Sequence, residues 1–178
     1  MTKPVNLESD PNSALEELYR RPGFLIRRAQ QIAVSLFLEE TGALRITSTQ
    51  YGILLVLKHR PGIDQISVAK LLGLDRSTTG MVLGKLEKAG LIGRIVGKKD
   101  RRKRNLALTE AGERMLERLV EPARKAQAHV LSAFSPRERA AFLALLEKFV
   151  LKFNGSTRVP IENGHGTERR NSKTELRI

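Results

Sequence analysis

Apolar residues recur every three or four positions along most of the chain, between two polar ends. Such a stripe is typical of amphipathic helices, so the chain is predicted to be mainly α-helical. Within residues 13–40 the stripe is interrupted at Pro22 and Gly23, which predicts a short helix followed by a longer one. Segments 1–12 and 154–178 are polar with little periodicity. They are predicted to be a disordered N-terminal tail and a flexible C-terminal tail.

Two helix starts are marked by capping boxes. In this motif a hydroxyl residue and a Glu or Gln three positions later each bond the other's backbone N–H group. Thr47 with Gln50 predicts the start of one helix, and Ser135 with Glu138 predicts the start of the last one. A helix between them contains Pro122, which predicts a kink.

Two short helices joined by a tight turn are predicted in the middle of the chain. The first covers Ile66–Leu72, and Gly73 supplies the turn. Asp75 caps the second helix, which Gly90 ends. Two short helices joined in this way form a helix-turn-helix unit.

The charge balance indicates what kind of partner the protein binds. The chain has 32 Lys and Arg residues and 19 Asp and Glu residues, which gives a formal charge of +13. Such an excess points to a polyanion: nucleic acid first, an anionic membrane surface second. Residues 94–104 alone hold seven cations and one anion. A charge run is usually a solvated face or a disordered tail. This one lies between apolar segments, 91–96 and 104–108, so we interpret it as the tip of a β-hairpin.

A helix-turn-helix followed by a basic hairpin is a winged helix-turn-helix, which binds DNA. The second helix fits the major groove, and the hairpin tip, or wing, fits adjacent phosphates or the minor groove. The residues predicted to contact DNA from the helix are Arg76, Ser77, Thr78, Gly80, Met81 and Lys85. Those predicted to do so from the wing are Lys98, Lys99, Arg101, Arg102 and Arg104.

Glycines within the second helix, Gly80 and Gly84, lower its intrinsic helix propensity. They allow two interpretations. The helix backbone approaches DNA or a neighbouring element closely, or the helix is loosely ordered until DNA binds.

Several other functions are disfavoured by what the sequence lacks. The absence of Cys excludes disulfides and thiolate metal sites, and the three His residues lie too far apart for a His-rich zinc motif. No Gly-rich phosphate loop or nucleophile–base motif stands out, so neither an enzyme nor a cofactor is expected. No apolar run approaches the roughly 18 residues that span a bilayer, and the polar N-terminus does not read as a signal peptide. We therefore expect a soluble, cytoplasmic protein that does not associate with membranes.

The apolar stripes near the two ends exceed what a small DNA-binding lobe can cover. We therefore expect residues 13–46 and 109–153 to form a helical homodimerisation region, with the winged helix-turn-helix lobe at 47–108. A two-fold dimer would place its two recognition helices roughly 34 Å apart on a palindrome. One larger monomeric core is the alternative.

The sequence resembles the MarR family of bacterial transcription regulators over roughly residues 24–150. The stretch LGLDRSTTGMVLGKLEKAGLI is similar to the family's recognition helix and its exit into the wing. The family's wing pattern is matched by Asp100, Arg102, Leu106, Leu108, Thr109 and Gly112. The resemblance implies a homodimer that binds an inverted repeat in double-stranded DNA.

The resemblance also implies roles within the wing. Asp100 would brace it by pairing with an arginine, and Arg101 or Arg102 would reach the minor groove. Met81 is a departure, because many relatives carry a base-contacting Arg at that position. That departure leaves the operator sequence open.

The opening RPGFLIRRAQQIAVSLFLEE resembles a branch of the family that represses aromatic-acid degradation. That branch implies a repressor released by a small aromatic carboxylate or its aromatic acyl-CoA thioester. An apolar slot with one Arg and one Tyr hydroxyl suits such a ligand. The residues predicted to line it are Phe24, Arg28, Ile32, Leu36, Tyr51, Leu55, Met115 and Leu119. The alternative for these residues is plain core and dimer contacts. The alternative function is an architectural DNA-binding protein with little sequence preference.

Overall fold

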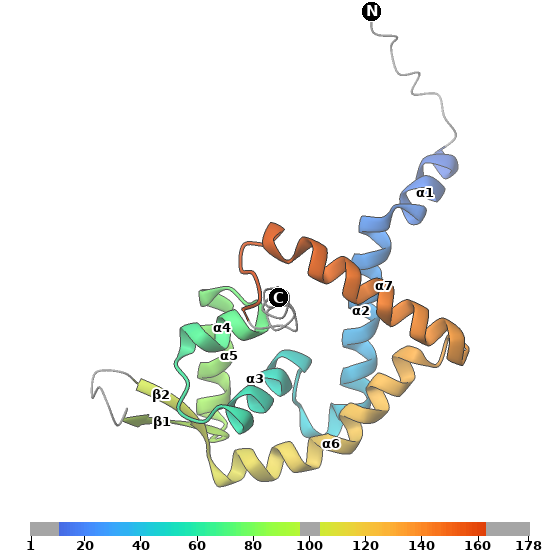
Figure 1. Ribbon diagram of the computed structural model, residues 1–178. Coiled ribbons are helices and arrows are strands. Elements are labelled where there is room, and N and C mark those ends of the chain that lie inside the picture. The colour runs from blue at the N-terminus through green and yellow to red at the C-terminus, as the bar shows by residue number, and fades with distance from the viewer. Residues whose placement is uncertain (1–10, 97–103, 163–178) are drawn as a thin grey trace, which may run out of the picture.

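The computed structural model describes residues 11–96 and 104–162, and it is mainly α-helical with a small antiparallel sheet. Figure 1 shows α3, α4, α5 and the hairpin on one side and α1, α2 and α7 on the other, with α6 running between the two groups. In chain order the elements are α1 (Pro11–Arg20), α2 (Pro22–Thr41), η1 (Gly42–Leu44), α3 (Ser48–His59), α4 (Gln65–Leu72), α5 (Arg76–Lys88), β1 (Ile92–Val96), β2 (Arg104–Leu108), α6 (Glu110–Leu131), α7 (Pro136–Phe153) and η2 (Asn154–Ser156).

The predicted break in the first helical segment is confirmed. Arg21 is extended, with φ −66° and ψ 133°, and Pro22 occupies the first turn of α2. A residue before proline is disfavoured in the helical region, so the chain leaves the helix at Arg21 and re-enters it at Pro22. The predicted N-terminal tail of residues 1–12 was too long, because α1 begins at Pro11.

Both predicted capping boxes are present. The backbone N–H of Thr47 donates to Oε1 of Gln50 at 2.9 Å, and the N–H of Gln50 donates to Oγ1 of Thr47 at 3.3 Å. Ser135 and Glu138 form the second box at the start of α7. These side chains satisfy N–H groups that have no partner within their helices, and they fix where α3 and α7 begin.

The hairpin of β1 and β2 gains a third, one-residue strand that the sequence pattern did not predict. Ile63 pairs antiparallel with Leu106, whose N–H donates to the Ile63 carbonyl oxygen at 2.8 Å. The N–H of Gly62 donates to the Leu106 carbonyl oxygen at 2.9 Å. Gly62 has a φ of +83°, a conformation that favours glycine, so Pro61-Gly62 both ends α3 and turns the chain onto the sheet.

The main hydrophobic core is centred on the predicted DNA-binding lobe, residues 47–108, and extends beyond it into α6. It joins α3, α4, α5, the hairpin and the first half of α6, and it includes the fully buried Leu54, Leu86 and Leu119. A second, smaller cluster of Phe37, Ala123 and Ala126 joins α2 to α6. Because α6 contributes to both clusters, it connects the lobe to the outer helices.

Two further predictions concern α6 and the C-terminal segment. Helix α6 runs unbroken through Pro122 and bends along its length (Figure 1). Residues 154–162 were predicted to belong to a flexible tail, which is wrong: they contain η2 and hydrogen-bond back to α4. The polar composition of this segment suggested a tail, but the side chain of Asn154 bonds it to Ile161. Within the two described ranges, no helix is both long and apolar enough to span a membrane.

Candidate nucleic-acid interface

The start of α5 is held by Asp75. Its carboxylate accepts hydrogen bonds from the backbone N–H and from the hydroxyl of Thr78, each at 2.7 Å. These bonds stabilise the ionised form and lower the pKa of Asp75 below its ordinary value. The hydroxyl of Thr79 is turned inward and donates to the Asp75 carbonyl oxygen at 2.8 Å. The first turn of the recognition helix is thus fixed before any ligand arrives.

Gly80 allows α4 to approach α5 closely. A Cβ at this position would lie 3.2 Å from Nε2 of Gln65, the first residue of α4. That nitrogen donates to the Arg76 carbonyl oxygen at 3.4 Å. Of the two interpretations of Gly80, the structure therefore favours close approach, and the neighbour is Gln65. No sequence pattern pointed to Gln65, because its contact joins two different helices, α4 and α5.

Gly84 differs from Gly80, because a Cβ there would meet nothing within 4 Å. Gly84 is exposed, and it lies on the same side of α5 as Ser77 and Met81, which is 57% exposed. The opposite side of α5 is buried and comprises Thr79, Val82, Leu83 and Leu86. The outward face of α5 therefore carries the short polar side chain of Ser77 near its start and no side chain at Gly84.

The predicted helix contacts mostly lie on this outward face. Arg76, Ser77, Met81 and Lys85 are exposed, whereas Thr78 and Gly80 are half-buried. The Thr78 hydroxyl is already bonded to Asp75, so it is less available to a base than the hydroxyl of Ser77. The outward face thus offers two cations, one hydroxyl and one thioether.

An ion pair ties the end of α5 to the first strand of the wing. Nη2 of Arg94, on β1, lies 3.2 Å from Oε2 of Glu87, and Nε of Arg94 donates to Oε1 of the same carboxylate. The hydrogen bonds that the Arg94 guanidinium donates to the Glu87 carboxylate raise the pKa of Arg94. The pair neutralises an acidic side chain next to the candidate DNA surface. Sequence reasoning missed it, since nothing in the local pattern links α5 to β1.

The Leu-Thr-x-x-Gly part of the wing pattern has a direct structural cause. The Thr109 hydroxyl donates to the Gly90 carbonyl oxygen at 2.6 Å and accepts from the N–H of Gly112 at 3.0 Å. Gly112 lies against the backbone of Leu91, where a Cβ would be 1.9 Å from the carbonyl oxygen. These contacts join the end of the recognition helix, the wing and α6 at one point.

The wing tip itself lies outside the described residues, which applies to Lys98, Lys99, Asp100, Arg101 and Arg102. The predicted brace by Asp100 and the predicted wing contacts therefore stay predictions. The backbone of Arg104 is described and pairs with Val96 at the last rung of the hairpin. The two strands thus lead into the basic tip from opposite directions.

The residues of the predicted effector slot fall into two groups. Tyr51, Leu55 and Met115 are half-buried around the main core, which contains the fully buried Leu119. The remaining four lie on α2, where Leu36 is half-buried and Ile32 is 46% exposed. The structure thus gathers the α3 and α6 members of the slot.

The two outermost members of the slot lie on the first turns of α2. The Phe24 ring packs 5.2 Å from that of Tyr19 and 4.9 Å from the guanidinium carbon of Arg27. Arg28 is exposed, so it is not the buried arginine that would need a partner inside the slot.

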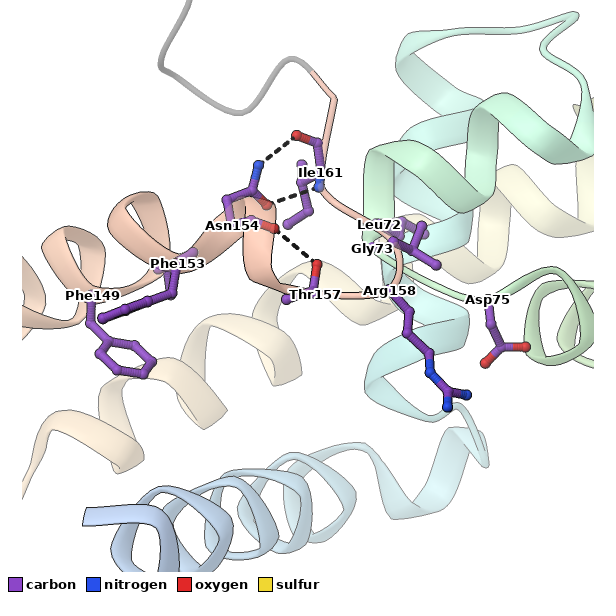
Figure 2. A pocket seen from close by; sticks show the side chains of 11 residues that line it. Leu72, Gly73, Asp75, Phe149, Phe153, Asn154, Thr157, Arg158 and Ile161 are labelled. Atoms are coloured by element: carbon purple, nitrogen blue, oxygen red, sulfur yellow. Dashed lines mark hydrogen bonds between the residues drawn. The ribbon is translucent and has the colours of Figure 1, made fainter.

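Among the described residues, cavities border the outer helices at two places. One, of about 410 Å³, lies between α2, α6 and α7. The other, of about 460 Å³, lies between the end of α7, the segment after it and the α4–α5 turn (Figure 2). Neither is lined by any of the eight residues of the predicted slot. The described residues contain no cluster of three or more His, Asp or Glu side chains that could hold a metal ion.

An exposed helix face, held by a capped turn and followed by a hairpin that leads into a cationic tip, defines a winged helix-turn-helix protein. Comparison with known proteins agrees with this class. The sequence model of the MarR family matches residues 46–103, which cover α3, α4, α5 and β1 and end just before β2. The chain belongs to the MarR family, and it is a transcriptional regulator rather than an enzyme.

Individual relatives extend the match beyond the lobe. A Thauera aromatica protein, assigned as a putative transcriptional regulatory protein for the hcr operon, is 32% identical over 127 residues. These make up 71% of this chain and 76% of the relative. The crystal structure of the PcaV transcriptional regulator from Streptomyces coelicolor is 32% identical, with a TM-score of 0.66. The match covers 76% of this chain and 98% of PcaV.

The transcriptional repressor CouR is similar in two solved states. Bound to a 23-mer DNA duplex, it is 29% identical with a TM-score of 0.70, and the match covers 76% of this chain and 96% of CouR. Bound to p-coumaroyl-CoA, it is 27% identical with a TM-score of 0.69 over 75% of this chain and 94% of CouR. The predicted family and fold class are therefore confirmed.

Proposed function

We propose that this protein is a homodimeric repressor that binds an inverted repeat through α5 and the wing. An aromatic carboxylate or its CoA thioester would then release it from DNA. The DNA-binding part of this proposal rests on the outward face of α5. That face exposes Arg76, Ser77, Met81 and Lys85 to solvent. Within α5 the one acidic residue is Glu87, which is paired with Arg94.

In this proposal the face of α5 enters the major groove. Ser77 and Arg76 reach base edges or phosphates near the start of the helix, and Lys85 reaches a phosphate further along. Gly84 lets the helix backbone approach the groove, because no side chain stands between it and solvent. Lys98, Lys99, Arg101, Arg102 and Arg104 supply the phosphate or minor-groove contacts of the wing.

Dimerisation is supported by unburied apolar side chains on the outer helices. No residue of α7 is buried, and its exposed apolar residues include Leu145 at 66% and Leu151 at 57%. On α1 and α2, Tyr19 and Leu25 are likewise about half exposed. A surface of this kind is typical of a subunit interface, since a monomer rarely leaves so much apolar area in water.

The dimer has a simple test in solution. Leu145→Glu places a charge in the apolar surface of α7 and is expected to shift the protein from dimer to monomer in sedimentation equilibrium. Ile66→Glu is the matched control, because Ile66 is 56% exposed on α4, in the DNA-binding lobe, and should leave the dimer intact. A wild-type chain that sediments as a monomer at micromolar concentration would rule the dimer out.

The effector half of the proposal rests on relatives and on the predicted slot. CouR binds p-coumaroyl-CoA, and PcaV has been solved with its natural ligand. The half-buried Tyr51 could offer its hydroxyl and the exposed Arg28 its charge, with Phe24, Ile32, Leu36, Leu55, Met115 and Leu119 as apolar lining. A ligand reaching Leu119 would have to separate α2 from the core, and this movement would change the spacing of the two recognition helices.

The experiment that tests the proposal is selection of binding sites from a random DNA library, followed by effector titration. An inverted repeat preferred by about 10³-fold or more over random DNA would support a specific regulator. Unselective recovery would favour an architectural protein instead. Benzoate, p-coumarate and p-coumaroyl-CoA would then be titrated into the complex, where release of about 5-fold or more is expected for at least one of them.

A further inference from the structure

The described part of the chain continues past helix α7. Residues 154–162, called here the C-terminal strap, turn back from the end of α7. Figure 2 shows the side chain of Asn154 bonded to Ile161. Its Nδ2 donates to the Ile161 carbonyl oxygen at 3.1 Å, and its Oδ1 accepts from the Ile161 N–H at 2.9 Å. One side chain thereby closes the strap into a loop.

Two more features stiffen this loop. The Thr157 hydroxyl donates to the Asn154 carbonyl oxygen at 3.0 Å. Pro160 fixes its own φ and restricts the residue before it to extended conformations. The strap therefore loses little further conformational entropy when it packs against another element.

The strap packs against the end of α4, the first helix of the helix-turn-helix. The N–H of Glu162 donates to the Lys70 carbonyl oxygen at 3.2 Å, and Nζ of Lys70 lies 2.8 Å from Oε1 of Glu162. Because α4 ends at Leu72, the Lys70 carbonyl is one of the last four, which have no partner within the helix. The strap supplies the missing donor.

The strap also contacts the turn between the two helices. Gly73 has a φ of +62°, and a Cβ there would lie 3.1 Å from Cγ1 of Ile161. On its inner side the turn is held by the N–H of Leu74, which donates to the Ala69 carbonyl oxygen at 2.9 Å. The turn, which leads within three residues into the recognition helix, is therefore held from both sides.

We propose that the C-terminal strap positions the recognition helix by tying the α4–α5 turn to α7, with Asn154 and Ile161 as the positioning residues. The tie joins an outer helix directly to the DNA-reading unit, alongside the connection through α6. A turn that is already ordered pays less conformational entropy when the recognition helix binds DNA, so the strap raises operator affinity. This consequence rests on the DNA-binding function proposed above, whereas the tie itself does not.

The tie is tested without DNA by amide hydrogen exchange on the full-length chain. Asn154→Ala removes both bonds that close the strap, and the amides of Leu74 and Glu162 are expected to exchange roughly tenfold faster. Ile161→Ala, which removes the contact with Gly73, should speed exchange at Leu74. Ser156→Ala is the matched control, because Ser156 is exposed in the same strap. Wild-type exchange at Leu74 in both variants would overturn the tie.

A cross-link tests the same geometry independently of stability. The chain has no cysteine, so a Lys70→Cys/Glu162→Cys double variant carries a single pair of thiols. Air oxidation should join them within one chain, because the backbone atoms of the two residues are already hydrogen-bonded. The cross-link should form more slowly when Asn154→Ala is added. Failure to form it in the otherwise native chain would contradict the placement of the strap.

The functional consequence is read from affinity for a DNA site selected by the protein itself. Asn154→Ala and Ile161→Ala are expected to bind it roughly 3- to 10-fold more weakly, and Ser156→Ala equally well. Unchanged or tighter binding by the first two variants would overturn the positioning role, even if their amides exchange faster. If the wild-type chain selects no DNA at all, the proposed function fails, and the exchange and cross-link results still decide the tie.

Discussion

Gly112, in the first turn of α6, lies so close to Leu91 that a Cβ on it would be 1.9 Å from the Leu91 carbonyl oxygen. No real side chain tolerates that distance from a backbone atom. The same carbonyl accepts from the N–H of Thr109 at 3.1 Å, so it cannot swing away without losing a bond. The contact fixes the position of the residue before β1 relative to the first turn of α6.

Gly112→Ala should therefore destabilise the protein despite the better helix propensity of alanine. The backbone at Leu91 must shift, and overpacking of this kind costs about 1–3 kcal/mol. The free energy of unfolding would be measured by urea titration at a fixed protein concentration. Gly42→Ala is the control, because a Cβ at Gly42 meets nothing within 4 Å. Equal stability of the two variants would contradict the close contact.

Two cations of the DNA-binding lobe can be compared: Lys85 has no ion-pair partner among the residues that the structure describes, whereas Arg94 has one. Lys85 is exposed on the outward face of α5, whereas Arg94 is bonded to Glu87. Lys85→Met should reduce the slope of log affinity against log salt concentration by roughly one unit per protomer, since one phosphate contact is lost. Arg94→Met should reduce that slope by less than half as much.

The measurement is DNA affinity at several potassium chloride concentrations, with the same duplex throughout. If Arg94→Met flattened the salt dependence as much as Lys85→Met, the pair with Glu87 would have to open on DNA. That result would mean that Arg94 also contacts a DNA phosphate.

The elements of the DNA-binding lobe could be predicted because each has a local cause. Thr47 with Gln50, Gly73 and Asp75 fix helix ends through contacts within a few residues, and all three signals were read correctly. The one-residue strand at Ile63 could not be predicted, because its partner, Leu106, lies 43 positions away and a single residue leaves no alternating pattern.

The candidate site was predictable only in part, for a similar reason. An outward face follows from helical periodicity, so the exposure of Ser77 and Met81 could be foreseen. The approach of Gln65 to Gly80 and the pairing of Glu87 with Arg94 depend on how elements pack, which periodicity does not report. The C-terminal strap was missed because Asn154 and Ile161 were read as part of a polar segment.

Acid should weaken the protein partly through Asp75. Its pKa is lowered in the folded state by the bonds from Thr78, so between the folded and the unfolded pKa only the unfolded chain binds the proton. The contribution is present above the ordinary value near 4 and is lost as pH falls through the folded pKa. Asp75→Asn keeps a capping side chain but does not titrate.

The expected result is that Asp75→Asn reduces the proton uptake on unfolding by up to about one proton between pH 4 and pH 2. Urea unfolding at a series of pH values measures this uptake as the slope of the unfolding free energy against pH. A slope identical to that of the wild type would mean that the pKa of Asp75 does not differ between the folded and the unfolded state.

Alanine substitutions at the two glycines of α5 can distinguish an effect on helix stability from an effect on DNA contact. A Cβ at Gly84 would meet open space, whereas a Cβ at Gly80 would meet Gln65. Gly84 has open space where a Cβ would be, so Gly84→Ala should raise the free energy of unfolding by about 0.5–1 kcal/mol. At Gly80 the new methyl group would press on Nε2 of Gln65, whose bond to the Arg76 carbonyl oxygen would be weakened. Gly80→Ala is therefore expected to gain little stability or none.

The effect on DNA binding should run the other way. If the backbone at Gly84 approaches the major groove, Gly84→Ala should weaken binding to a selected site even though it stabilises the free protein, because the methyl group holds the helix off the bases. Gly80→Ala should affect binding less, since its methyl group points toward α4. Affinity and urea unfolding measured on both variants give four values. A stabilised Gly84→Ala protein with wild-type affinity would place the DNA on a different part of α5.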